Sequence, residues 1–306
     1  MVVRSSGLPD SVTIWEVGAR DGLQNESTSV DTTVKLEFIE RLAGAGLPIV
    51  EATSFVRPDW VPQLADADDL MRRLPRRAGV RYPVLVPNPR GLDRALQADT
   101  ADIAVFASAT ETFARRNLNR GLDTQWEMFE PTISAARVEG MRVRGYVSMC
   151  FGDPWEGPVP LEQVVEVCVR LHHLGCESLS LGDTIGVATP GHVAALLRAL
   201  FGAGVPAQAV GVHFHDTYGQ ALANTLAALQ EGVTTVDSSA GGLGGCPYAR
   251  SATGNLATED LVWMLEGLGI STGVDLDALV QTSVWMADLL GRNSPSRVVR
   301  AIAGGS

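Results

Sequence analysis

Lysine is almost absent from this chain of 306 residues, which contains only Lys35. This lysine lies in TTVKLEFIERLAGAG, where apolar residues recur at helical spacing, so we expect it on a helix outside any active site. Enzymes that form a Schiff base need a desolvated lysine inside the site. Carbonyl chemistry in this protein therefore has to use a metal ion or an oxyanion hole.

Long apolar runs and targeting signals are also missing. No run approaches the roughly 20 apolar residues of a membrane-spanning helix, and the opening MVVRSSGLPD is too short and too polar for a signal peptide. We therefore expect a cytoplasmic protein without a membrane partner. The formal net charge of −11 argues against nucleic acid as a partner.

Paired cysteines are missing as well. The chain has four cysteines, at positions 150, 168, 176 and 246, and none forms a C-x-x-C pair. This spacing excludes a zinc knuckle and a thioredoxin-like redox motif. Without a signal peptide, we expect all four thiols to be reduced.

What the chain does have is a regular alternation of short β-branched runs and longer amphipathic segments. Eight of these runs are predicted to be strands, at residues 12–17, 48–53, 81–86, 102–107, 142–148, 177–182, 209–214 and 234–239. The pattern predicts an α/β fold, a single (β/α)8 TIM barrel over about residues 12–270 with a C-terminal helical extension over about 271–306. A doubly wound sheet is less favoured because no G-x-G-x-x-G follows the first strand.

Polar residues stand where these strands end, which is where barrel enzymes carry their active sites. Five segments contribute to this rim: Arg20 and Asp21 after the first strand, Glu51 in the second, Asp183 after the sixth, His213 and His215 at the seventh, and a glycine-rich loop with Cys246 after the eighth.

The segment HFHD raises the question of a metal site. On a strand, residues two apart face the same way, so His213 and His215 would both point into the barrel mouth while Phe214 faces the helices. An isolated H-x-H can equally be a pair of hydrogen-bonded core histidines. Asp21 and Asn255 can add oxygen ligands, and this mixture of nitrogen and oxygen favours Mg²⁺ or Mn²⁺, with Zn²⁺ as the alternative.

The loop SSAGGLGGCPYARSATGN offers a thiol between glycine and proline. A phosphate-binding loop is excluded because no G-K-[S/T] follows. Cys246 can be a small buried turn residue. We favour a functional thiol carried on a mobile lid.

Five segments resemble one family over nearly the whole chain, about residues 12–292. They are EVGARDGLQNE (16–26), EATSFVRPDWVPQLAD (51–66), SLGDTIGVATPG (180–191), VHFHDTYGQALANTL (212–226) and GGLGGCPYARSATGNLATEDLVWMLEGLGI (241–270). These resemble the 3-hydroxy-3-methylglutaryl-CoA (HMG-CoA) lyases, which belong to a metal-dependent aldolase-like TIM-barrel superfamily.

The resemblance implies a role for each rim residue. It implies a divalent cation on Asp21, His213, His215 and Asn255, and an Arg20 that stabilises enolate charge. It also implies that Cys246 transfers a proton and that Glu51 and Asp183 support the site. Asp183 and Asp21 are both candidates for the general base.

The implied reaction is cleavage of HMG-CoA to acetyl-CoA and acetoacetate, a step of leucine degradation and ketone body metabolism, by a homodimer. Two alternatives within the superfamily stay open, a lyase for a related 3-hydroxyacyl-CoA and a condensing enzyme of the isopropylmalate or homocitrate synthase type. An amidohydrolase is disfavoured because it would carry H-x-H on its first strand. A non-catalytic metal-binding protein is also an alternative, but it would not explain why Arg20 and Cys246 lie beside the candidate ligands.

Coenzyme A needs cations for its phosphates, and ARRNLNRG (114–121) follows the fourth predicted strand on the active face. Arg115, Arg116 and Arg120 can make these contacts. A solvated basic loop explains the same residues equally well.

Overall fold

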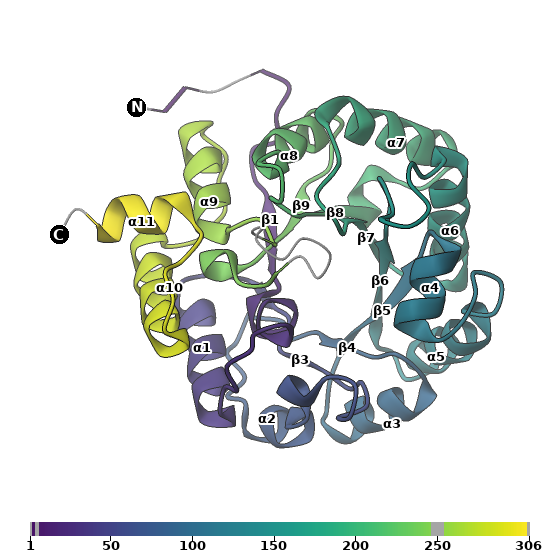
Figure 1. Cartoon of the computed structure of the whole chain (residues 1–306), viewed down its shortest axis with the longest axis horizontal. Coiled ribbons are helices and arrows are strands. Elements are labelled where there is room, and N and C mark those ends of the chain that lie inside the picture. The colour runs from purple at the N-terminus through teal and green to yellow at the C-terminus, as the bar shows by residue number, and fades with distance from the viewer. Residues whose placement is uncertain (1, 4–5, 246–253, 305–306) are drawn as a thin grey trace.

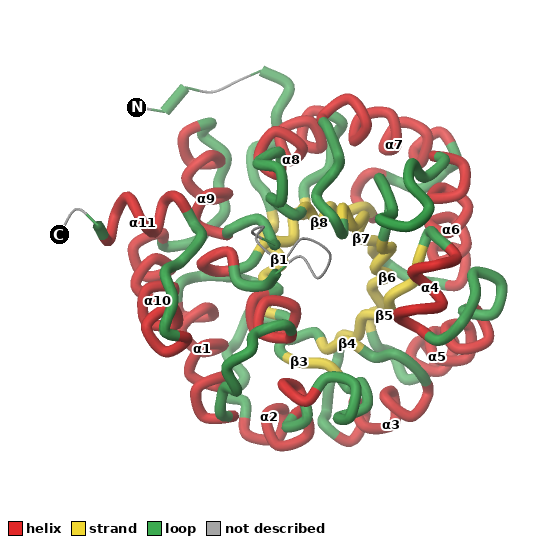
Figure 2. Tube along the Cα trace, viewed as in Figure 1, coloured by secondary structure: helices red, strands yellow, loops and turns green. Residues whose placement is uncertain are grey.

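A closed ring of parallel strands forms the centre of the molecule (Figures 1 and 2). The computed structural model describes residues 2–3, 6–245 and 254–304. Its sheet runs in the order β2-β1-β9-β8-β7-β6-β5-β4-β3, and every pairing is parallel. The two end strands, β2 (Ile49–Val50) and β3 (Thr53–Ser54), are consecutive in the chain, so they act as the two halves of one barrel strand.

The other strands coincide with the β-branched runs of the sequence. They are β1 (Thr13–Glu16), β4 (Val84–Leu85), β5 (Asp102–Ser108), β6 (Arg142–Ser148), β7 (Ser178–Asp183), β8 (Val210–Phe214) and β9 (Thr235–Ser238). The (β/α)8 barrel expected from the sequence is confirmed.

Helices surround the ring and bury the outward faces of the strands. In chain order they are α1 (Thr32–Gly44), α2 (Ala67–Arg73), α3 (Pro89–Gln97), α4 (Glu111–Leu118), α5 (Trp126–Val138), α6 (Leu161–Leu174), α7 (Pro190–Gly202), α8 (Ala221–Gln230) and α9 (Thr258–Gly267). Glycine ends α6, because Gly175 adopts a positive φ of 105° that other residues avoid. As the sequence predicts, Phe214 is buried on the face of β8 away from the cavity that His213 and His215 line, and its ring centroid lies 6.1 Å from that of Phe151 in the loop after β6.

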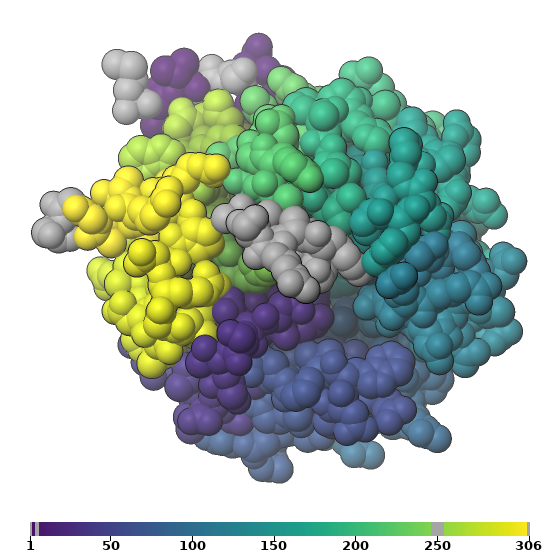
Figure 3. All heavy atoms as spheres, in the orientation of Figure 1, coloured from purple at the N-terminus to yellow at the C-terminus, as the bar shows by residue number. Residues whose placement is uncertain are grey.

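Two further helices, α10 (Leu276–Leu290) and α11 (Arg297–Ala303), form the C-terminal extension that the sequence predicts. Figure 3 shows them in yellow beside the purple N-terminal part of the chain. Trp285 of α10 packs on Phe38 of α1 at 6.5 Å between ring centroids, and the amide of Asp275 donates to the carbonyl of Ala45. The extension therefore covers the outside of α1.

Lys35 lies on α1, as expected, and not in the barrel mouth. Its ammonium is buried and pairs with Asp66 at 2.8 Å. This placement agrees with the exclusion of Schiff-base chemistry. Within the described residues, no helix is long and apolar enough to cross a membrane.

Candidate active site

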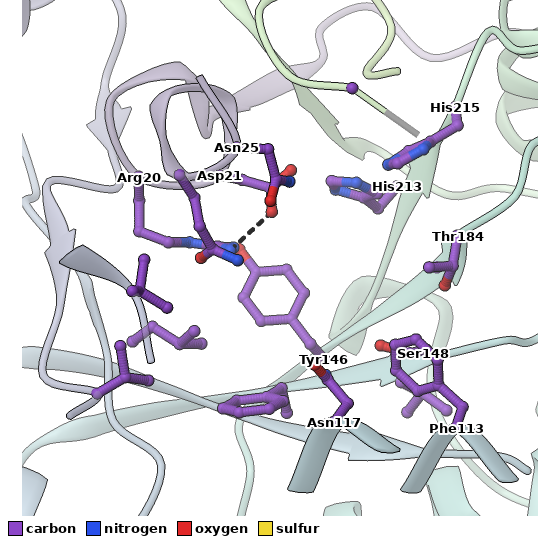
Figure 4. Close-up of a pocket in the computed structure, with 18 of the residues that line it drawn as sticks. Arg20, Asp21, Asn25, Phe113, Asn117, Tyr146, Ser148, Thr184, His213 and His215 are labelled. Atoms are coloured by element: carbon purple, nitrogen blue, oxygen red, sulfur yellow. Dashed lines mark hydrogen bonds and ion pairs between the residues drawn. The ribbon is translucent and has the colours of Figure 1, made fainter. Parts of the chain in front are cut away.

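A cavity of about 300 Å³ opens where the barrel strands end (Figure 4). Its polar lining comes from most of the strand ends, and the described residues that contribute include Arg20, Asp21, Asn25, Asn117, Tyr146, Ser148, Thr184, His213 and His215. The size suits a small acyl group together with a few polar anchors.

A short π-helix places Arg20 and Asp21 in this cavity. It spans Gly18–Gly22, directly after β1, and π-turns of this kind are frequent at functional sites. A β-carbon on Gly18 would lie 2.6 Å from Oε1 of Glu16, and one on Gly22 would lie 2.9 Å from Cβ of Leu243. The turn fits beneath the loop after β9 only because both residues lack side chains.

Arg20 is held by carboxylates on two sides. Its Nε donates to Oε1 of Glu51 at 2.6 Å, and its Nη1 donates to Oδ1 of Asp21 at 2.8 Å. Burial would lower the pKa of the guanidinium, but Glu51 and Asp21 more than compensate and raise it further above its usual range. The side chain is thus a fixed cation at the cavity wall.

Tyr146 is a site residue that the sequence analysis did not identify. Its hydroxyl donates to Oε2 of Glu51, which also accepts from Nε1 of Trp15 at 3.1 Å. The guanidinium of Arg20 lies 5.5 Å from the centre of the tyrosine ring. The alternation of RVRGYVS would have placed Tyr146 on the inner face of β6.

Asp21 lies between Arg20 and the two histidines, His213 and His215 (Figure 4). One potential ligand atom from each of Asp21, His213 and His215 lies within 4.8 Å of those of the other two. Although burial opposes it, the charge of Arg20, His213 and His215 lowers the pKa of Asp21 to about 2. Burial and the neighbouring His213 lower the pKa of His215 to about 4. At neutral pH the three therefore present a carboxylate beside at least one neutral imidazole, as a divalent cation requires.

Asn255 joins this group through the backbone. It forms an antiparallel bridge with His215, and its Nδ2 donates to Oδ2 of Asp21 at 2.8 Å. Oδ1 of Asn255 and Nδ1 of His215 are buried and have no hydrogen-bond partner among the described residues. Unsatisfied buried atoms of this kind are costly, and a cation would satisfy them. The donor set therefore fits a divalent cation.

Comparisons with known proteins agree with this geometry. The HMGL-like family model matches residues 11–285. A mitochondrial hydroxymethylglutaryl-CoA lyase of Rattus norvegicus is 51% identical over 96% of this chain and 90% of its own length. The chain belongs to the HMG-CoA lyase family. The resemblance seen in the sequence is thereby confirmed.

Solved structures of the family share the fold closely. The hydroxymethylglutaryl-CoA lyase of Pseudomonas aeruginosa superposes with a TM-score of 0.95 at 45% identity, covering 98% of this chain and 100% of that one. An HMG-CoA lyase of Acinetobacter baumannii in complex with coenzyme A and 3-methylmalate gives a TM-score of 0.91 at 34% identity, covering 99% of this chain and 97% of that one.

Asp183 does not line the cavity itself. Its neighbours Gly182 and Thr184 line the cavity, whereas its own oxygens accept from the amides of Val187 and Ala188 at 2.9 and 3.1 Å. Burial raises the pKa of Asp183 to about 6. The carboxylate thus holds the loop after β7 and stands just behind the cavity wall.

The three arginines expected to contact coenzyme A lie on and after α4, outside the described cavity lining. Phe113 and Asn117, one helical turn apart, supply that lining from α4. Arg115 pairs with Glu111 at 2.5 Å, Arg120 lies 3.5 Å from Glu127, and Arg116 stacks on the ring of Trp155 at 4.3 Å.

Cys246 lies outside the described residues. Gly245, which precedes it, lines the cavity. Cys150, Cys168 and Cys176 are buried free thiols. Burial raises the pKa of Cys168 and of Cys176 to about 12 and raises that of Cys150 well above its usual value.

Proposed function

We propose that this protein cleaves HMG-CoA to acetyl-CoA and acetoacetate. The observation that carries the proposal is the pairing, in one cavity of an HMG-CoA lyase family member, of a fixed arginine with the cluster of Asp21, His213 and His215. This arrangement provides a cation for enolate charge beside a site for a chelated hydroxyl.

Asp21, His213, His215 and Asn255 are the residues that would hold the divalent cation. When bound, the cation would lower the pKa of the substrate's C3 hydroxyl and fix its orientation. Two imidazoles with a carboxylate and an amide oxygen favour Mg²⁺ or Mn²⁺ and also permit Zn²⁺. The unpartnered Oδ1 of Asn255 supports this assignment.

Arg20 would stabilise the charge that develops as the C2–C3 bond breaks. The bonding electrons pass to the thioester carbonyl and form the enolate of acetyl-CoA, while C3 becomes the ketone of acetoacetate. A guanidinium already held by Glu51 and Asp21 needs no reorganisation to meet this charge. Glu51 and the Tyr146 hydroxyl would keep Arg20 in place.

Two proton transfers complete the reaction. We propose that Asp21 or Asp183 accepts the C3 hydroxyl proton: Asp21 lines the cavity, whereas Asp183, whose pKa burial raises to about 6, stands behind the cavity wall. Cys246 would deliver a proton to the acetyl-CoA carbon from the glycine-rich loop.

The coenzyme A moiety would extend from the cavity towards α4. A smaller hollow of about 80 Å³ shares Val56, Trp60, Phe106 and Asn117 with the main cavity and offers a route in that direction. Arg115, Arg116 and Arg120 would then reach the phosphates.

The compartment and the oligomer are also proposals. The family includes mitochondrial and cytoplasmic relatives, and we propose a cytoplasmic homodimer with one catalytic domain per chain, the barrel over about 12–270 and the extension over about 271–306. Light scattering after size exclusion would give the mass of the assembly, and a value near twice 32.5 kDa is expected.

The test of the function is product analysis with a panel of 3-hydroxyacyl-CoA thioesters in the presence of Mg²⁺. We expect acetyl-CoA and acetoacetate from HMG-CoA by mass spectrometry. Parallel reactions of acetyl-CoA with 2-oxoacids probe condensation. Faster turnover of another thioester, or condensation without cleavage, would replace the proposal with one of the alternative reactions.

A further inference from the structure

An ion pair fills the barrel interior directly below the cavity. Arg144 of β6 and Asp237 of β9 meet at 2.5 Å between Nη2 and Oδ1, and their side chains are at most 1% exposed. Barrel interiors are ordinarily filled by branched apolar side chains. A buried charged pair in this position requires an explanation.

The strands are shaped to admit this contact. Arg144 reaches past β7 and β8 to Asp237, and a β-carbon on Gly211 of β8 would lie 2.8 Å from its Nη2. Ser180 of β7 donates to Oδ2 of Asp237 at 2.7 Å. The Trp15 ring lies 3.9 Å from the guanidinium carbon. Two strands thus supply the contacts to the carboxylate, β6 through Arg144 and β7 through Ser180, while Gly211 and Trp15 accommodate the guanidinium.

Stability does not explain the pair well. Burying two charges costs more than their attraction returns unless every polar atom is satisfied, and apolar replacements of such pairs are often neutral. Nε and Nη1 of Arg144 have no hydrogen-bond partner among the described residues. The pair therefore carries a cost that an apolar filling would avoid.

The carboxylate lies next to a residue of the candidate metal site. Asp237 and His213 are register partners on β9 and β8, and Nδ1 of His213 lies 3.4 Å from Oδ2 of Asp237. In the present orientation of the imidazole ring, Nδ1 of His213 does not form a hydrogen bond to this oxygen. A small rotation of the ring would form it. Hydrogen bonds at catalytic sites commonly tighten only when the site is filled.

We infer that Asp237, held by Arg144 and Ser180, is a positioning residue that accepts the Nδ1 proton of His213 and thereby directs Nε2 towards Asp21 and His215. Ligating histidines almost always donate their second ring nitrogen to such an acceptor, which fixes the tautomer and the ring orientation. The inference rests on the proposed metal site.

The test measures Mn²⁺ affinity by calorimetry on chelator-treated, folded protein. Asp237→Asn is expected to raise the Kd by about 10–100-fold, the usual effect of losing such a partner. The matched control is Asp102→Asn, because Asp102 is also a buried carboxylate that pairs with arginines, Arg81 and Arg142, but at the start of β5 and away from the cavity. Its Kd should stay at the wild-type value.

A double variant guards against misfolding of Asp237→Asn, which leaves Arg144 without its carboxylate. Arg144→Met with Asp237→Asn removes both charges, so it should fold and show the same rise in Kd. A folded Asp237→Asn or double variant with the wild-type Kd would overturn the inference. Unfolding of both would also overturn it, because the pair would then serve to hold the barrel together.

His213→Ala separates this inference from the metal site itself. If His213→Ala also binds Mn²⁺ with the wild-type Kd, the proposed metal site is wrong. If His213→Ala weakens binding and Asp237→Asn does not, the metal site stands and the positioning role of Asp237 fails.

Discussion

Arg20 is the residue whose geometry most directly links the structure to the chemistry. Its Nε and Nη1 are engaged by Glu51 and Asp21, so the planar guanidinium is fixed before substrate arrives. A lysine at this position would offer one ammonium in place of a fork and could not keep both contacts in the same geometry.

Arg20→Lys and Arg20→Ala should therefore lower kcat by about 10²–10³, the usual cost of removing one transition-state contact. Both variants should still bind Mn²⁺, since Arg20 is not a proposed ligand, although each loses the hydrogen bond that Arg20 donates to the ligand Asp21. Steady-state kinetics with a parallel Mn²⁺ titration would measure both effects. A kcat near the wild-type value in Arg20→Lys would show that a simple positive charge suffices.

Cys246 can be tested by its reactivity. Cys150, Cys168 and Cys176 are buried, and their raised pKa values leave little thiolate at neutral pH. Alkylation should therefore inactivate the wild type through Cys246, and substrate should slow the loss. Cys246→Ser should turn over slowly and resist further inactivation.

Full activity of Cys246→Ser would contradict the proton-transfer role. Inactivation of that variant at the wild-type rate would assign the effect to another thiol.

At the scale of elements, α4 presents different faces to the cavity and to solvent. Phe113 and Asn117 face inward, while Arg115, Arg116 and Arg120 lie outside the cavity lining. If these arginines contact the coenzyme A phosphates in substrate and transition state alike, replacing all three with alanine should raise KM and leave kcat nearly unchanged.

The matched control replaces Arg198 with alanine, because this arginine is 70% exposed and pairs with Glu231 on a different part of the helical layer. Kinetics at varied HMG-CoA concentration would compare the two. An unchanged KM in the triple variant would make the segment a solvated basic surface.

The elements also show how far sequence reasoning extends. Each strand coincides with a β-branched run of the sequence. The alternation of side chains along β8 places His213 and His215 on the same face, in the cavity. Local patterns do not reveal the π-turn at Gly18–Gly22, which depends on contact with the loop after β9, more than 200 residues later. The role of Tyr146 was missed for the same reason, since its partner Glu51 is 95 residues away.

For the whole molecule, buried carboxylates tie the start of the glycine-rich loop to the barrel. Glu16 accepts from the amides of Gly18 and Ala240, and Glu259 accepts from the amide of Gly241 and the hydroxyl of Ser283. Burial raises the pKa of Glu16 to about 7 and that of Glu259 to about 8. Glu16, which also accepts from the hydroxyl of Thr258, connects the catalytic end of the barrel with α9, and Glu259 connects it with α10.

Glu259 should make global stability depend on pH. Because its pKa rises from an ordinary 4.5 to about 8 on folding, its stabilising contribution is fully present below pH 4.5 and is lost as the pH rises through about 8. Urea unfolding of the wild type at pH 6 and pH 9 should show this loss, and Glu259→Gln should show a smaller one.

The control for this measurement is Glu166→Gln on the exposed face of α6. It should change stability with pH as the wild type does. An equal loss in the wild type and in Glu259→Gln would mean that Glu259 is not the group that titrates.

The central claim is that a divalent cation held by Asp21, His213, His215 and Asn255 is required for cleavage of HMG-CoA. The most direct measurement is acetoacetate formation by chelator-treated protein as Mg²⁺ or Mn²⁺ is added back, with bound metal counted per chain. The account predicts a folded, inactive apoprotein that regains activity as one ion binds, and a folded His215→Ala that regains neither the ion nor activity. Cleavage by the metal-free protein, or full metal occupancy in His215→Ala, would contradict it.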